Sequence, residues 1–150
     1  MYQNGNEAKL FHNTGTFAAP VWAEVTNIRD LTLNVEKTQL DASTRASKWA
    51  LTKTGLKKAS VDFQMIFDAA DTDYGVFRDA FFSEVAGEDE LELAVMSEDI
   101  ATVGAEGLHA LFVTTTFNRN EPLDDLVLID VAIAPTPTAD ALPAWMEVAA

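Results

Sequence analysis

The hydrophobic period changes between residues 57 and 85, and this change predicts the class of fold. In VDFQMIFD, residues 61–68, apolar and polar positions alternate apart from Ile66, as in a strand with one buried face. The apolar residues that follow lie at helical spacing: Tyr74, Phe77, Phe81 and Val85. Burying each helix aromatic would contribute roughly 1.5 to 3 kcal/mol, so this helix needs a sheet on which to pack.

Both ends of the helix carry sequence signals. Asp71 or Thr72 is the expected N-cap, and Asp73 places negative charge in the first turn. Gly87 follows the last periodic residue and is the expected stop.

The rest of the chain reads mostly as strand. A break is expected at residues 27–30, and Gly55 is expected to turn the chain into the strand of residues 61–67. Seven or eight strands with one helix predict a mainly antiparallel β-sandwich or barrel with one packed α-helix, as a single domain over residues 1–150. The expected strands cover residues 8–13, 21–28, 31–36, 49–53, 61–67, 91–95, 108–117 and 125–134.

Alternation in three of these strands separates a buried face from a polar face. The buried face is expected to hold Leu31, Leu33, Val35, Val61, Phe63, Met65, Val127, Ile129 and Val131. The polar face then holds Thr32, Asn34, Glu36, Asp62, Gln64 and Asp130.

Two segments have no strand or helix pattern. Residues 38–48 are polar and lack periodicity, which predicts a long loop, extending over 38–53, that is either functional or disordered. Residues 135–150 are expected to form an extended C-terminal tail, because Pro135, Pro137 and Pro143 disfavour sheet and helix. We expect this tail to dock through Leu142 and Trp145.

Composition excludes several classes of protein. The chain has 150 residues and no cysteine, which rules out a disulfide framework, thiolate zinc sites and cysteine catalysis. No apolar run has the length of a membrane span and the N-terminus does not resemble a signal peptide, so we expect a soluble protein made in the cytoplasm. The net charge of −14 argues against a conventional nucleic-acid binder.

Charge is distributed unevenly along the chain. Residues 37–58 hold six of the ten basic residues and one acid, whereas residues 59–106 hold thirteen acids and one base, Arg78. One interpretation is two solvated faces folded back on each other. The other is head-to-tail contact between copies, with the basic surface of one against the acidic surface of the next.

No catalytic, cofactor-binding or metal-binding residues are predicted. His12 and His109 each fall in a predicted strand without a patterned acid or nucleophile beside them, which favours a structural role. Residues 71–75, DTDYG, begin like a calcium loop but lack its later ligands, so helix capping explains them better. Trp22, Trp49 and Trp145 could form a sugar-stacking platform, although core or interface anchors are the more common use.

Three segments resemble the tail tube (major tail) proteins of long-tailed bacteriophages. They are NTGTFAAPVWAEVTNIRDLTLNVEKTQLDASTRASKW, LKKASVDFQMIFDAADTDYGVFRDAFF and LHALFVTTTFNRNEPLDDLVLIDVAIAPTP, followed by a terminal PAW. The resemblance runs in order from about residue 9 to residue 145. Its most specific parts are residues 25–37, Thr44-Arg45 and residues 117–123.

The resemblance implies a non-enzymatic virion protein, assembled in the host cytoplasm, that forms stacked hexameric rings around a lumen for DNA. It also implies tape measure, tail terminator and distal tail proteins as partners, with no membrane and no cofactor. We expect residues 38–53 to form an inter-subunit loop. Inter-subunit contacts are expected at Arg45, Lys48, Trp49 and Trp145, and a lumen lined by Glu36, Asp62, Gln64 and Asp130.

Three alternatives stay open at this point. The same fold serves as the inner tube of contractile injection machines and of phage-derived gene-transfer particles. A β-sandwich recognition module would be a monomer with a tryptophan-lined pocket. A small hydrolase is the weakest alternative, because it requires His12 or His109 to converge with carboxylates in a cleft.

Overall fold

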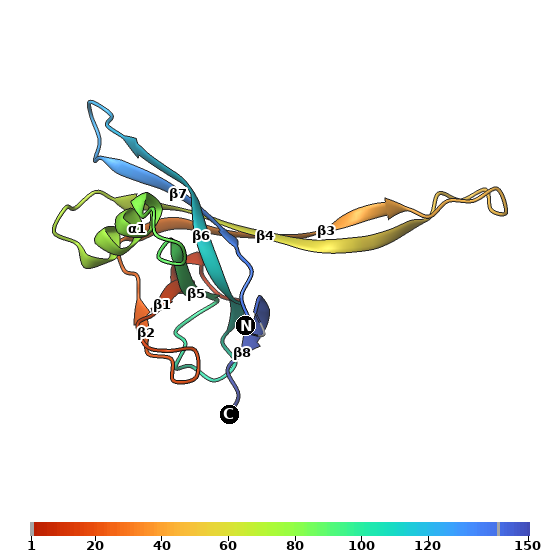
Figure 1. Cartoon of the computed structure of the whole chain (residues 1–150), viewed down its shortest axis with the longest axis horizontal. Helices are drawn as coiled ribbons and strands as arrows, with labels where there is room; N and C mark the ends of the chain where they lie inside the picture. Colours follow the sequence, from red (N-terminus) through yellow and green to blue (C-terminus); the bar gives the residue numbers. More distant parts are fainter. Residues whose placement is uncertain (1, 141) are drawn as a thin grey trace.

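A computed structural model describes residues 2–140 and 142–150 of the chain (Figure 1). Within these residues there are eight strands, one α-helix and a short 3-10 helix. In chain order they are η1 (Gly5–Glu7), β1 (Lys9–Asn13), β2 (Trp22–Glu24), β3 (Ile28–Asp41), β4 (Thr52–Ile66), α1 (Thr72–Phe82), β5 (Glu90–Met96), β6 (Glu106–Asn120), β7 (Leu128–Pro135) and β8 (Ala144–Glu147).

The strands form one antiparallel sheet that curves around a core. Its order is β2-β1-β5-β6-β7-β4-β3, and β8 pairs with the start of β6. Buried residues of β1, β4, β5, β6 and β7 belong to a single apolar cluster, so the curved sheet encloses its own core. The predicted fold class, mainly antiparallel β with one packed helix, is confirmed.

The core follows the alternation seen in the sequence. Across β4 and β7, Val61 lies opposite Ile133, and Phe63 lies opposite Val131. All four side chains are buried, and they belong to the same apolar cluster as Phe77 of α1. The ring of Phe77 meets that of Phe63 edge to face at 5.3 Å between centroids, which joins helix to sheet.

The N-terminal end of α1 is as predicted, but its C-terminal end is not. The carboxylate of Asp71 caps the helix by accepting the N–H of Asp73 at 3.3 Å. The helix ends at Phe82, so Val85 lies outside it and is exposed. The hydroxyl of Ser83 accepts the N–H of Val85, which offers the backbone an alternative to continued helix. Gly87, with φ of 89°, therefore belongs to the next turn rather than to the helix stop.

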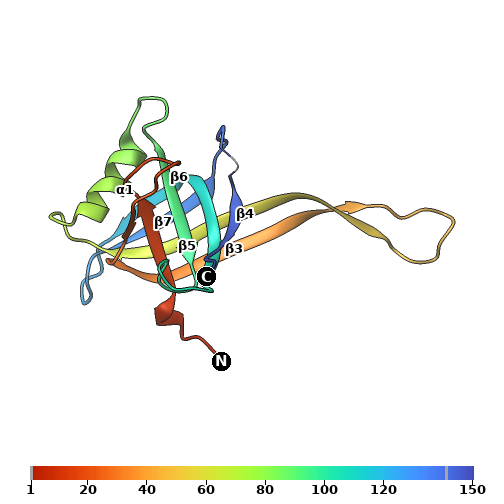
Figure 2. The same cartoon turned by 90° about the horizontal axis from the view of Figure 1, so that it is seen from below.

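The predicted long loop is mostly a β-hairpin that projects from the domain. Strands β3 and β4 run on together beyond the sheet, and only residues 42–51 between them are outside strands (Figure 2). Gly55 lies inside β4 rather than at a turn, where a Cβ would collide with the hydroxyl of Thr38. Because both faces of this projecting hairpin are exposed, its sequence has no buried face and so no alternation to detect.

The predicted buried face is correct only where the hairpin lies against the core. Leu31 and Leu33 are partly buried, whereas Val35 is 53% exposed because it lies where β3 leaves the domain. Val127 precedes β7 and is only partly buried. The predicted break at residues 27–30 is wrong: β3 begins at Ile28 and contains a bulge instead.

The C-terminal segment is not free of sheet. Residues Ala144–Glu147 form β8, in which Trp145 lies opposite Leu108 of β6. Met146 and Val148 pack on a second apolar cluster that includes Phe11. A proline lacks a backbone N–H, so it cannot donate a hydrogen bond to a neighbouring strand. This affects only the proline itself, and a short strand forms directly after Pro143.

Candidate functional site

The projecting part of the β3–β4 hairpin, residues 35–58, is called the arm. It exposes large apolar side chains that its own domain does not cover: Val35, Leu40, Trp49, Leu51 and Leu56. Trp49 is 78% exposed and Leu56 is 79% exposed. The arm also holds the six clustered basic residues of the sequence. Apolar and cationic side chains gathered on a projecting hairpin are typical of a segment that binds another surface.

Local hydrogen bonds hold the tip of the arm in shape. The N–H of Ala42 donates to the carbonyl of Leu51 at 2.9 Å, and Ser43 bonds back to Leu51. Asp41 accepts the N–H of Ser43 at 2.9 Å, and hydrogen bonds from Ser43 lower the pKa of Asp41 below its usual value. The tip carries Arg45, Lys48 and Trp49 together, as the sequence predicted for a contact segment, but whether they touch another copy stays a prediction.

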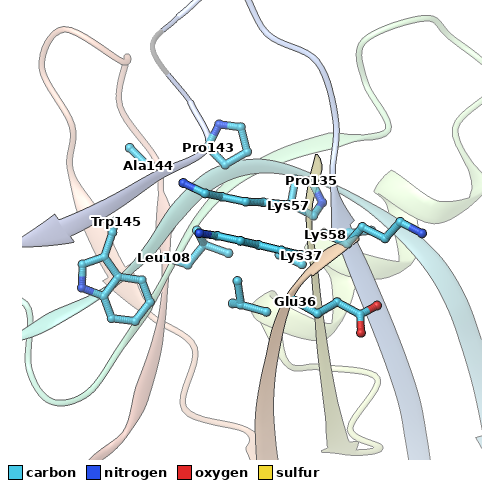
Figure 3. Close-up of a pocket in the computed structure, with 12 residues that line it drawn as sticks. Glu36, Lys37, Lys57, Lys58, Leu108, Pro135, Pro143, Ala144 and Trp145 are labelled. Atoms are coloured by element: carbon cyan, nitrogen blue, oxygen red, sulfur yellow. The ribbon is translucent and has the colours of Figure 1, made fainter. Parts of the chain in front are cut away.

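A groove of about 860 Å³ opens where the arm leaves the domain (Figure 3). Lys37 and Lys57 lie side by side across it, directly opposite each other in the β3–β4 register. Trp145 lies at its edge and is 58% exposed, so this predicted contact residue lines a surface rather than a core. The charged residues Glu36 and Lys58 also line it, and its remaining walls are apolar or small: Val35, Ala59, Leu108, Ala134, Pro135, Pro143 and Ala144.

The polar face of the sheet forms a second surface. Asp62 and Asp130 line a shallow hollow of about 420 Å³ together with Gln64 and Asp30. The amide of Gln64 donates to Asp130 at 2.9 Å, and Asn120 also donates to Asp130. Three carboxylates thus share one face of the sheet, held partly in place by neighbouring amides.

The structure brings together three of the four residues predicted for a lumen. Asp62, Gln64 and Asp130 are adjacent, whereas Glu36 lies farther along, opposite Lys58 at the base of the arm. Figure 3 shows Glu36 and Lys58 pointing away from Lys37 and Lys57.

Sequence reasoning missed Asp30 as a member of this polar face. Its φ of 56° places it in the bulge between Arg29 and Thr32, which turns an extra residue toward the polar face. The available signal was an aspartate at a break in alternation, because aspartate tolerates positive φ better than most residues.

The two histidines have structural surroundings. His109 bonds to the carboxylate of Glu92 at 2.7 Å, and the ring of Trp22 packs against it edge to face. Burial lowers the pKa of His12, while the carboxylates of Asp73 and Glu92 partly offset this effect. Burial and the nearby Asp71 raise the pKa of Asp73.

The lowered pKa of His12 predicts a loss of stability on mild acidification. The folded state favours neutral His12. The stability that this preference contributes is therefore fully present above about pH 6.5, and it is lost as the pH falls through the lower pKa of His12 in the folded state. Between about pH 7.5 and pH 5.5, we expect the melting temperature of His12→Gln to fall by less than that of the unchanged chain. Equal losses in the two proteins, measured by thermal denaturation, would contradict this assignment.

Other kinds of site have little support. Among residues 2–140 and 142–150, histidine and acidic side chains form no group of three or more that could hold a metal ion. The helices of this described part are too short or too polar to cross a membrane.

Comparison with known proteins identifies the fold. No protein-family model and no curated protein matches the chain. Among solved structures, it is similar to the tail of an empty gene transfer agent (GTA) particle with C6 symmetry: the TM-score is 0.70 at 18% identity, covering 99% of this chain and 100% of the other.

Two further structures share this architecture. The SPP1 tail tube has a TM-score of 0.68 at 8% identity, over 87% of this chain and 74% of the other. The baseplate of the anti-feeding prophage has a TM-score of 0.53 at 11% identity, over 84% of this chain and 85% of the other. At these identities the likeness is one of fold: the chain has the fold found in tail tubes.

Proposed function

We propose that this chain is the tail tube subunit of a bacteriophage or a phage-derived gene-transfer particle. In this role it is a structural virion protein, not an enzyme, and six copies close into a ring that stacks into a hollow tube. Tape measure, terminator and distal tail proteins would cap or fill that tube. DNA would pass through the lumen without specific binding.

The observation that carries the proposal is the arm. It projects from an otherwise complete domain and exposes Leu40, Trp49, Leu51 and Leu56 to solvent. Burying these side chains against a neighbouring copy would supply roughly 1.5 to 3 kcal/mol each, which offsets part or all of the entropy cost of association.

The neighbours differ in how well they support the possible particles. The GTA tail and the SPP1 tail tube match at TM-scores of 0.70 and 0.68, against 0.53 for the anti-feeding prophage baseplate. This order favours a phage-like or gene-transfer tail over the inner tube of a contractile injection machine.

The proposal is tested by sedimentation of the purified chain over a range of concentrations. A tube subunit self-associates into species far larger than its 16.3 kDa as concentration rises. A recognition module stays monomeric at micromolar concentration. Purely monomeric behaviour at all concentrations, in low and in moderate salt, would exclude the proposal.

Within the tube, the polar sheet face is proposed to line the lumen. Asp30, Asp62 and Asp130 would then repeat around the wall. The negative charge of Glu36 would be partly neutralised by Lys58, which lies opposite it in the β3–β4 register. Duplex DNA carries about one negative charge per 1.7 Å of axis, so an acidic wall repels it and a basic wall would retain it.

Reversing these charges is expected to make the tubes bind DNA. Tubes of Glu36→Lys/Asp62→Lys should retain duplex DNA at low salt and release it as salt screens the contacts. Glu36→Gln/Asp62→Asn is the matched control, since it removes the charge without adding a cation, and it should retain far less. Co-sedimentation of labelled duplex with the tubes measures this. Equal retention by lysine and amide variants would show that this face makes no contact with DNA in the tubes.

A further inference from the structure

The groove beside the arm lies between two strand edges that are open in the described part of the chain. Residues 57–59 of β4 pair with β3 on one side, while pairing with β7 begins only at Val61. On the far side of the groove, β8 pairs with β6 alone. The groove is thus a slot with an apolar floor and two strand walls (Figure 3).

The rim of this groove is strongly cationic. Lys37 and Lys57 are directly opposite each other, and like charges in that position repel. Neither forms an ion pair with any residue that the structure describes. Glu36 also lines the groove, but its carboxylate points away from both lysines and forms no ion pair with either. Carboxylates brought by another molecule would relieve the repulsion.

The turn between β6 and β7, residues 121–127, carries exposed apolar and acidic side chains, which complement the apolar floor and cationic rim of the groove. Leu123 is 98% exposed and Leu126 is 56% exposed. Between them lie Asp124 and Asp125, two carboxylates without a basic partner among the described residues. The turn and the arm project from opposite ends of the domain in both views, so this turn faces away from the groove of its own copy (Figures 1 and 2).

We infer that the β6–β7 turn of one copy docks into the groove of the next copy. Leu123 packs against the apolar floor near Leu108 and Trp145, and Asp124 and Asp125 lie beside Lys37 and Lys57. The contact is head to tail, so it propagates from copy to copy instead of ending at a dimer. This inference rests on the proposed function and names the surfaces through which the copies meet.

The acidic turn after α1 fits the groove less well. Hydrogen bonding does not separate the two turns, because Glu88 accepts a hydrogen bond from the Ser83 hydroxyl at 3.2 Å and Asp125 accepts the N–H of Leu126 at 2.7 Å. The apolar residue of the turn after α1, Val85, is 58% exposed, against 98% for Leu123. This turn serves as the matched control for the experiments below.

Charge reversal tests the pairing of groove and turn. Lys37→Glu/Lys57→Glu and Asp124→Lys/Asp125→Lys should each raise the concentration needed for assembly roughly tenfold, because attraction becomes repulsion. The chain that carries all four changes should assemble within about threefold of the unchanged chain. Glu88→Lys/Asp89→Lys should have little effect. All the altered side chains are exposed, and unchanged thermal melting confirms folding.

Failure of the inference is distinguishable from failure of the proposed function. If the unchanged chain does not assemble, the proposed function falls and the inference with it. If the unchanged chain assembles and the reversed pairs assemble equally well, the docking inference alone is wrong. The docking inference is also wrong if both double variants lose assembly and the chain that carries all four changes does not regain it.

A cross-link gives an independent readout, because the chain contains no cysteine. Leu123→Cys copies mixed with Lys57→Cys copies should form a disulfide-linked dimer on mild oxidation, whereas each variant alone should not. Val85→Cys mixed with Lys57→Cys is the control. A cross-link only in that control mixture would assign the groove to the turn after α1 and contradict the inference.

Discussion

Shortening the arm is expected to abolish tube formation while leaving a folded monomer. Gln39 and Thr54 are cross-strand partners, so residues 40–53 can be replaced by a two-residue Asn-Gly turn without disturbing the remaining ladder. The removed segment contributes no side chain to either apolar cluster, which predicts an unchanged melting temperature. It contains Leu40, Trp49 and Leu51, and with them most of the apolar surface offered to a neighbour.

Sedimentation and thermal melting of the shortened chain measure both halves of this prediction. Trp49→Ala in the full-length arm is the graded comparison, and it should weaken assembly by a few kcal/mol at most, as for one interface aromatic. A shortened chain that assembles at the same concentration as the unchanged one would show that the arm is not an inter-subunit segment.

Phe77→Ala is expected to be the most damaging single substitution for the fold. Phe77 is 1% exposed and joins α1 to the sheet through Phe63. Truncating a buried phenylalanine costs about 3–5 kcal/mol, a large part of a typical stability of about 5–15 kcal/mol. The melting temperature should fall by about 10 °C or more.

Phe82→Ala on the same helix is the matched control. Phe82 is mostly exposed, so its loss should cost no more than about 1 kcal/mol. Denaturant unfolding of the two variants compares them directly. Equal destabilisation would mean that Phe77 does not anchor the helix as described.

The sequence predicted the fold best where burial shapes the pattern of residues. Val61, Phe63 and Met65 alternate because one side of β4 meets the core, and the helix stripe of Tyr74 and Phe77 has the same cause. The predicted fold class, the cap at Asp71 and the central strands followed from these patterns.

Prediction failed where strands have no buried side or where single side chains decide the backbone. The arm is strand on both sides of residues 42–51, yet both its faces are exposed, so its sequence resembles a loop. The bulge at Asp30 shifts the pairing register of β3 because this one residue has a positive φ, and the hydrophobic pattern of the sequence contains no sign of it. The early end of α1 depends on hydrogen bonds of Ser83 that follow from the fold of the next turn.

The candidate surfaces were predictable in part for the same reason. Asp62, Gln64 and Asp130 alternate with buried residues, so their common face could be deduced before the structure was known. The groove could not, because Lys37, Leu108 and Trp145 come from three distant segments that only the topology brings together.

Cryo-electron microscopy of the purified, concentrated chain shows whether it assembles into a tube and which face lines the lumen. We expect hollow tubes of stacked six-membered rings, with Asp62 and Asp130 on the inner wall and the arm lying against a neighbouring copy. Monomers alone, or tubes in which Asp62 and Asp130 face outward, would contradict this expectation.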